Sequence, residues 1–237
     1  LYRMNEPLLR ELRPDFILTQ QLCDVCAVGY GAVAALAANL PTRPILVNLE
    51  PKCLADIFEN IRHVGKALGL NERADAANAD LEKRVAAVRT KAAELGRRPK
   101  VFLMEWIDPP FCSGHWGPEL VKIAGGEEIF GRQGERSVQV PWEEVIAAQP
   151  EVIVLACCGY KPEQTLKDLP ILQHLSGWNN LPAVNQRRVY VVDGNAYSHR
   201  PGPRIVDSLE ILAEIIHPEL FGGMFPDRGV VRLEKSA

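Results

Sequence analysis

The chain has 237 residues, 47% of them hydrophobic and 24% charged, which is enough for one large or two small domains with a sizeable core. A net charge of −3, with no Lys/Arg run longer than a pair, argues against a nucleic-acid-binding surface. No apolar run approaches the length that crosses a membrane, so no transmembrane segment is expected. Six irregularly spaced cysteines do not form the pattern of a secreted disulfide scaffold, and reduced thiols are expected.

The first seventy residues alternate between helix and strand patterns. Their strands are runs of consecutive apolar residues, which is typical of a parallel sheet covered by helices. Two strands make a thin sheet, so further strands of this region are expected upstream of Leu1 or are absent. The predicted elements are strands at 15–19 and 45–49, with helices at 6–12, from about Gln20, and at 54–68.

Residues 71–95 contain no proline or glycine and carry apolar side chains every three or four positions. Asn71 is a plausible N-cap, and Gly96 and Pro99 end the pattern. Such a helix would be about 37 Å long. It is interpreted as a rod between two lobes, or equally as a long helix inside one domain. The two-lobe interpretation divides the chain into an N-terminal lobe (1–70), a connecting helix (71–96) and a C-terminal lobe (97–237).

Beyond this helix the alternation is fuller, and the predicted fold class is α/β, with two Rossmann-like three-layer lobes containing parallel sheets and joined by one long helix. Strands are expected at 100–105, 151–156 and 188–192, and helices at 117–124, 142–148, 162–174 and 203–216. In such sheets, ligands bind at the carboxyl ends of the strands. That rule selects the loops 105–117, 157–161 and 193–203.

The loop 105–117 gathers Trp106, Phe111 and Trp116 with Asp108 and two prolines. Rigid aromatics with a few polar groups suit the floor of an apolar binding pocket, and the alternative is a loop that plugs the core of its own lobe. His115 is open to three interpretations, as a metal or cobalt ligand, a hydrogen-bond donor to a ligand, or a loop histidine.

The loop 193–203 places Tyr197 and Arg200 at a strand end, where they would form a polar, partly aromatic wall or a well-bonded turn. Cys23 and Cys26 follow a strand and precede a helix, a position that lowers a thiol pKa. They are interpreted as a structural or ligand-adjacent pair, or as a thiol–disulfide redox pair. The chain has no phosphate-loop, dinucleotide or nucleophile-elbow motif, so nothing positive indicates an enzyme.

Several segments resemble the helical-backbone (class III) substrate-binding proteins of ABC importers. These are LLRELRPDFILTQ, LSGWNNLPAVNQRRVYVVDG and RPGPRIVDSLEILAEIIHPE. Within that family, LCDVCAV and EWIDPPFCSGHWGPELVKIAGG are similar to the branch that binds cobalamin. The resemblance implies a receptor for cobalamin or a related corrinoid, held in a cleft between lobes, with no intrinsic cofactor and with a membrane permease as partner. A receptor for a ferric siderophore, haem or a metal ion is the alternative.

By this resemblance the ligand touches loops from both lobes. The implied contacts are Trp106, Asp108, Phe111, His115, Trp116, Tyr197 and Arg200 from the second lobe, and Gln20, Cys23 and Glu50 from the first. The family also implies an extracytoplasmic location, in the periplasm or tethered to a membrane. No signal peptide is visible after Leu1, so a cytoplasmic corrinoid carrier stays open.

Overall fold

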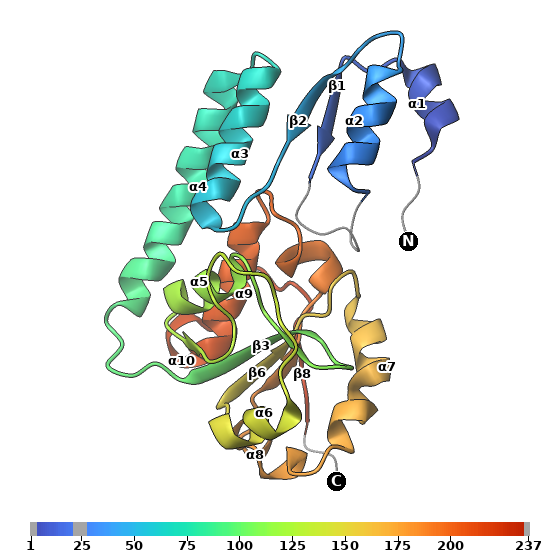
Figure 1. The fold of residues 1–237 in the computed structure, drawn as a ribbon. Helices are drawn as coiled ribbons and strands as arrows, with labels where there is room; N and C mark the ends of the chain where they lie inside the picture. Colours follow the sequence, from blue (N-terminus) through green and yellow to red (C-terminus); the bar gives the residue numbers. More distant parts are fainter. Residues whose placement is uncertain (1–3, 21–27, 235–237) are drawn as a thin grey trace. The chain divides into compact units, whose positions relative to one another are not determined.

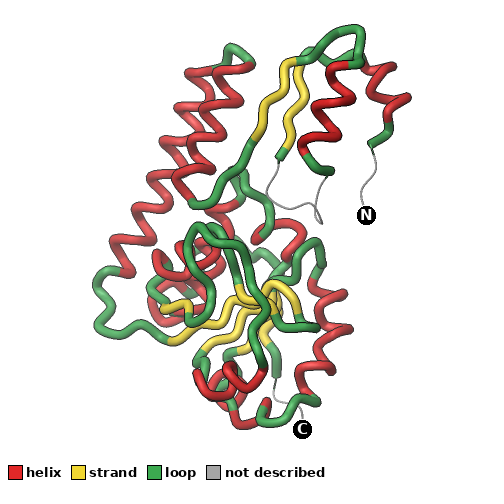
Figure 2. Tube along the Cα trace, in the orientation of Figure 1, coloured by secondary structure: helices red, strands yellow, loops and turns green. Residues whose placement is uncertain are grey.

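A computed structural model of the chain describes residues 4–20 and 28–234. Its contacts divide the chain into two compact units, one of residues 1–51 and 55–78 and the other of residues 52–54 and 79–237. Figure 1 labels the elements in chain order and Figure 2 marks them by type. The division falls inside one helix, between Asn78 and Ala79, and each unit is described by itself.

The first unit contains a two-stranded parallel sheet in which Phe16 lies opposite Ile45. The strand and helix pattern predicted for this region is confirmed in the described residues. The second helix was predicted from about Gln20; residues 21–27 of that prediction lie outside the described residues, and the described helix begins at Tyr30, after the N-cap Gly29. The elements are α1 (Glu6–Leu12), β1 (Phe16–Thr19), α2 (Tyr30–Ala38), β2 (Ile45–Asn48), most of α3 (Leu54–Ala67) and the start of α4 (Asn71–Ala92).

Helices α3 and α4 pack closely within this unit. A Cβ added at Gly65 would lie 2.4 Å from the Cβ of Ala74, so only glycine allows this approach. The buried side chain of Asn78 donates from Nδ2 to the carbonyl of Phe58 at 2.9 Å. The predicted long helix is confirmed, but α4 ends at Ala92 rather than at residue 96, because a turn with the bond Leu95 N to Ala92 O replaces its last residues. Its 22 residues span about 33 Å.

The second unit is built on a six-stranded sheet of order β4–β3–β6–β7–β8, with β5 also paired to β3. The predicted parallel strands are confirmed, and Val101 lies opposite Val152 while Ile153 lies opposite Val189. The prediction of a parallel sheet did not include two short edge strands, β4 and β8, which run antiparallel to β3 and β7. The strands are β3 (Lys100–Trp106), β4 (Phe111–Cys112), β5 (Glu127–Glu128), β6 (Val152–Leu155), β7 (Val189–Val191) and β8 (Val231–Arg232).

Helices cover both faces of this sheet, which gives the predicted three layers. Phe102 and Met104 of β3 belong to a buried cluster with Val145 of α6 and Leu172 of α7. Val101, which precedes Phe102 on the strand and points to the other face, packs near α5 and α9. Figure 1 accordingly shows α5, α9 and α10 on one side and α6, α7 and α8 on the other. These helices are α5 (Gly117–Ile123), α6 (Trp142–Ala148), α7 (Pro162–Gln173), α8 (Pro182–Asn185), α9 (Ile205–Ile216) and α10 (Pro218–Phe221).

Four charged side chains hold α4, α9 and the segment before β8 together within the second unit. Arg84 contacts Asp207 at 2.6 Å and Glu210 at 2.7 Å, and Arg228 contacts the same two acids at 3.0 and 2.7 Å. The Glu210 side chain is only 6% exposed, so its charge requires these partners. None of the helices in the described part of the chain is long and apolar enough to cross a membrane.

Candidate functional site

Three loops meet at the carboxyl ends of β3, β6 and β7, as the sheet rule predicts. The amide of Cys158 donates to the carbonyl of Glu105 at 3.0 Å, which joins the loop after β6 to the end of β3. The amide of Asn195 donates to the carbonyl of Tyr160 at 3.0 Å, which joins the loop after β7 to the loop after β6. The backbone contact is closest at Gly194, where an added Cβ would lie 2.1 Å from the Cys157 oxygen. The three loops therefore form one bonded surface.

The Trp116 side chain links the loop after β3 to the loop after β7. It is only 8% exposed, and its indole Nε1–H donates to the carbonyl of Ser198 in the loop after β7 at 3.0 Å. Glu105 supports the loop 105–117 from within, because its Oε1 accepts from the amide of Gly114 at 3.1 Å. The structure thus gives Trp116 a bracing role, and its predicted contact with a ligand stays a prediction.

His115 occupies a constrained position beside Trp116, with ring centroids 5.7 Å apart. Its φ of 51° is left-handed, which is uncommon for a side chain of this size, and the conformation is fixed by the bonds of its amide to Glu135 O and of its carbonyl to Gly134 N. Burial lowers the pKa of the imidazole, against the opposing effect of the Glu105 carboxylate. A lowered pKa keeps the ring neutral, the form in which a nitrogen can bind a metal centre.

Two aromatic side chains, Trp106 from the end of β3 and Tyr160 from the loop after β6, form an aromatic wall. Trp106 and Tyr160 meet edge to face with centroids 4.9 Å apart, and the indole Nε1–H of Trp106 donates to the carbonyl of Asp108 at 3.0 Å. They border a cavity of about 210 Å³ that also reaches Asp168 on α7. Tyr160 and Asp168 were not among the predicted site residues. Tyr160 lies in a loop that the sheet rule selected, but no sequence signal distinguishes Asp168. The remaining lining residues are Ile107, Asp108, Cys157 and Ile171.

The other predicted residues of this unit lie at the same end of the sheet. Phe111 on β4 is the cross-strand partner of Trp106. Tyr197 lies in a helical turn, Gly194–Ser198, whose start is capped by the carboxylate of Asp193 accepting from Ala196 N at 2.6 Å. The Arg200 guanidinium bonds back to Asn195, at 2.8 Å to its carbonyl and 2.7 Å to its side chain. Contact of these side chains with a ligand stays a prediction.

The predicted residues of the first unit are less constrained by the structure. Gln20 follows β1 and is partly buried, and Glu50 is exposed and accepts from Asn48 Nδ2 at 2.6 Å. Cys23 and Cys26 lie outside the described residues, so their role stays a prediction. Among the described residues, no group of three or more His, Cys, Asp or Glu side chains is arranged to hold a metal ion.

A buried carboxylate fills a gap under the loop 105–117. Strands β5 and β4 pair with different parts of β3, and between them the amide of Leu103 donates to Oε2 of Glu128 at 3.1 Å. Oε1 of Glu128 accepts from the amides of Phe130 and Gly131 at 3.3 and 3.1 Å. Burial, assisted by the charge of Glu105, raises the pKa of Glu128 to about 7 in spite of these bonds. This carboxyl therefore belongs to the support of the site rather than to its open surface.

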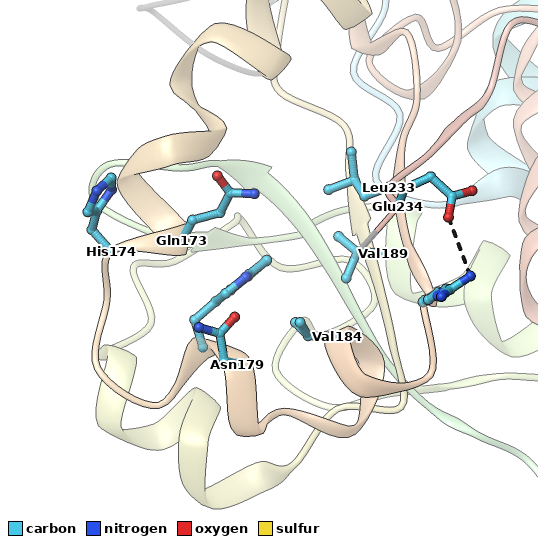
Figure 3. Close-up of a pocket in the computed structure, with 9 residues that line it drawn as sticks. Gln173, His174, Asn179, Val184, Val189, Leu233 and Glu234 are labelled. Atoms are coloured by element: carbon cyan, nitrogen blue, oxygen red, sulfur yellow. Dashed lines mark ion pairs between the residues drawn. The ribbon is translucent and has the colours of Figure 1, made fainter. Parts of the chain in front are cut away.

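A second hollow, of about 250 Å³, lies at the opposite end of the same sheet (Figure 3). Val189, the first residue of β7, forms part of it, together with His174 at the end of α7 and Asn179. The exposed ion pair between Arg187 and Glu234, with N and O 3.6 Å apart, closes one side. Because it lies at the amino end of β7, this hollow is separate from the three loops and provides control positions.

Comparison with known proteins gives a family. A model described as "Periplasmic binding protein" matches residues 9–196. The chain is 24% identical over 215 residues to an uncharacterized ABC transporter substrate-binding lipoprotein, YvrC, of Bacillus subtilis, which covers 89% of this chain and 64% of that protein. It is 26% identical over 165 residues to a vitamin B12-binding protein of Vibrio cholerae, which covers 68% of this chain and 55% of that protein.

Solved structures agree on the fold. The apo form of the periplasmic heme-binding protein RhuT from Roseiflexus sp. RS-1 matches with a TM-score of 0.73 and 23% identity, over 91% of this chain and 80% of that one. The two curated relatives are longer, since the chain spans 64% and 55% of their lengths. At such identity the structural match establishes the two-lobed α/β architecture and leaves the ligand open.

Proposed function

Because the chain belongs to the periplasmic binding protein family, we propose that it is the substrate-binding protein of an ABC importer and that it captures cobalamin or a related corrinoid. The family consists of solute-binding proteins, so the proposed activity is binding rather than catalysis. The observation that carries the proposal is the bonded surface at the carboxyl ends of β3, β6 and β7, whose loops carry the Trp106–Tyr160 wall and a His115 imidazole with a lowered pKa.

This surface suits a corrin in three respects. A large macrocycle needs broad apolar contact, which the aromatic wall supplies. Its amide side chains need a few fixed polar groups, and backbone groups of the three loops are held in place by their mutual bonds. Its cobalt takes a neutral imidazole as an axial ligand, which His115 is able to offer. The vitamin B12-binding relative from Vibrio cholerae supports the same ligand.

The partner and compartment follow from the family in the same proposal. An ABC importer delivers its ligand through a membrane permease, which is the expected protein partner. The lipoprotein relative of Bacillus subtilis supports an extracytoplasmic location. A cytoplasmic corrinoid carrier is the rival, and fractionation of cells that express the natural gene separates the two.

The test is a titration of the purified protein with hydroxocobalamin, followed by the visible spectrum and by the bound fraction. We expect saturable binding with a spectral shift in the wild type and in the control His174→Ala, an exposed histidine at the other end of the sheet. His115→Asn, which tolerates the left-handed backbone, is expected to lose the shift. Binding with the same spectral shift in this variant would show that His115 does not bind the cobalt, and the proposed receptor function would still stand.

Absence of saturable binding by folded protein would reject the corrinoid. Haem and ferric siderophores would then be titrated in the same way, since a ligand that binds only the native state raises the melting temperature. The redox alternative predicts a Cys23 or Cys26 thiol with a pKa well below about 8.5. An ordinary thiol pKa without reductase activity would reject it.

A further inference from the structure

We propose that the hollow at the amino end of β7 is a second small-molecule site, which takes an uncharged carbonyl compound with a small apolar ring. The site goes beyond the proposed function, because it lies at the end of the sheet away from the three loops and does not depend on the ligand that they bind. Its basis is an indole donor without an acceptor in the wall of a hollow of about 250 Å³.

Trp178 supplies this donor. The other three indole N–H groups of the chain donate to backbone carbonyls, those of Asp108, Ser198 and Ser176. Among the described residues no acceptor meets the N–H of Trp178, although this residue is only 4% exposed. The nitrogen is not sealed in the core, so it reaches the surface where Trp178 lines the hollow. An acceptor brought by a ligand would complete its hydrogen bonding.

Packing holds the Trp178 ring in place. Trp142 of α6 stacks beside it with ring centroids 6.1 Å apart, and the N–H of Trp142 is bonded to the carbonyl of Ser176 at 2.9 Å. The backbone amide of Trp178 donates to the carbonyl of Leu175 at 3.2 Å. The indole therefore does not turn to find an acceptor without breaking this packing. Because the donor is already ordered, a ligand that bonds to it loses little free energy to conformational entropy.

The other walls favour an apolar and uncharged occupant. Figure 3 shows the side chains of Val184, Val189 and Leu233 around the hollow. At its rim Arg187 and Glu234 pair with each other at 3.6 Å, so these two side chains add no net charge. An apolar cavity of about 150 Å³ is enough to hold benzene. A hollow of about 250 Å³ therefore has room for one such ring with a short polar arm.

Asn179 offers a second donor next to Trp178. It is exposed on the 3-10 turn Trp178–Asn180, it lines the hollow, and its side-chain amide has no hydrogen-bond partner among the described residues. A carbonyl oxygen accepts two hydrogen bonds, so it can use both donors. His174 is not part of this donor set, because its Nδ1 is bonded to the carbonyl of Pro170 on its own helix at 2.5 Å.

The experiment compares acetophenone with α-methylstyrene, in which a methylene group replaces the carbonyl oxygen and the shape is kept. Binding to the purified, ¹⁵N-labelled full chain is followed through the indole N–H signals of its four tryptophans. We expect acetophenone to bind saturably, to shift the Trp178 signal most, and to bind at least about fivefold more tightly than α-methylstyrene, which corresponds to one or two neutral hydrogen bonds. Equal affinities, or no binding of acetophenone by folded protein, would overturn the proposal.

Variants locate the binding. Asn179→Ala is expected to weaken acetophenone binding by about two- to fivefold and to leave α-methylstyrene unchanged. Its matched control is Asn180→Ala, a neighbouring exposed asparagine that does not line the hollow. Val184→Phe fills the hollow and should weaken both probes by about tenfold or more, whether or not Trp178→Phe folds and assigns the indole signal. Equal losses at Asn179 and Asn180, or full binding in Val184→Phe, would reject the site.

Hydroxocobalamin is titrated into the same samples, which separates the hollow from the three loops. Acetophenone should bind with the same affinity whether or not the corrinoid is present. Competition between the two would place acetophenone at the loops and would reject the second site. Acetophenone binding at Trp178 without any corrinoid binding would keep the second site and reject only the proposed corrinoid.

Discussion

Trp106 and Trp116 lie in the same loop, and the structure uses them differently. Trp116 is almost fully buried, and its N–H reaches Ser198, 82 residues further along the chain. Trp106 is only partly buried, and its N–H bonds to Asp108, two residues away. The first belongs to a frame that joins the three loops, and the second belongs to an open wall. Changes in the frame should therefore cost stability, and changes in the wall should cost binding.

A substitution at Gly194 is expected to destabilise the frame more than any other change considered. A methyl group there would meet the Cys157 carbonyl oxygen at 2.1 Å and would force the loops after β6 and β7 apart. We expect Gly194→Ala to lower the free energy of unfolding by about 3 kcal/mol or more. The measurement is urea denaturation. The control is Gly202→Ala, since an added Cβ there meets nothing within 4 Å. Similar small losses in both variants would mean that the loops do not depend on this contact.

The frame should also respond to pH through Glu128. Its pKa of about 7 in the folded protein lies above the ordinary value of 4.5, so the folded state binds the proton more tightly than the unfolded state. The stability from this group is complete below about pH 4.5 and is lost as pH rises to about 7, by up to about 3 kcal/mol. Denaturation curves between pH 4.5 and 8 measure the slope, and Glu128→Gln should flatten it. An unchanged slope in the variant would place the titration elsewhere.

The two tryptophans give the direct comparison. Trp116→Phe leaves the Ser198 carbonyl without its donor and removes buried ring volume, so we expect a loss of about 2 kcal/mol in stability. Trp106→Phe keeps an aromatic ring in a partly exposed place and should cost less than about 1 kcal/mol. Hydroxocobalamin affinity should fall more in the Trp106 variant than in a folded Trp116 variant. The reverse order of either result would contradict the division into frame and wall.

Arg200 should show the smallest effect. Its guanidinium is exposed and already bonded to Asn195, so Arg200→Ala is expected to cost less than about 1 kcal/mol in stability. Its effect on hydroxocobalamin affinity should stay below about threefold, which is less than 1 kcal/mol. A loss of more than tenfold would show that the guanidinium leaves Asn195 to contact the ligand, and Arg200 would then belong to the wall.

Local patterns were sufficient for most of the fold. The helix predicted at 142–148 has those bounds in the structure, because Pro141 precedes it and the left-handed Gln149 ends it. The strands β4, β5 and β8 were missed, since each has two residues and owes its pairing to a neighbouring strand rather than to its own sequence. The three loops selected by strand ends and aromatic content do lie together at one end of the sheet, and their contact with a ligand stays a prediction.

The division of roles within those loops could not be predicted. Trp116 is buried, and its indole N–H donates to the carbonyl of Ser198, which is distant in sequence. Asp168 reaches the cavity only because α7 places it beside the loop after β6. Both relations depend on packing between elements, whereas sequence reasoning sees one element at a time. The contributions predicted for Gln20, Cys23 and Glu50 stay predictions.

The margins of the sheet in the second unit have a consequence for behaviour at high concentration. Strands β4, β5 and β8, which border the longer strands, have two residues each, and a side-chain carboxylate occupies the Leu103 amide between two of them. Exposed strand edges are templates on which other chains add strands and aggregate. Edge strands of two residues, with the Leu103 amide already bonded to Glu128, offer little free backbone for such addition. The sheet of this unit is thereby protected against polymerisation by strand addition at its edges.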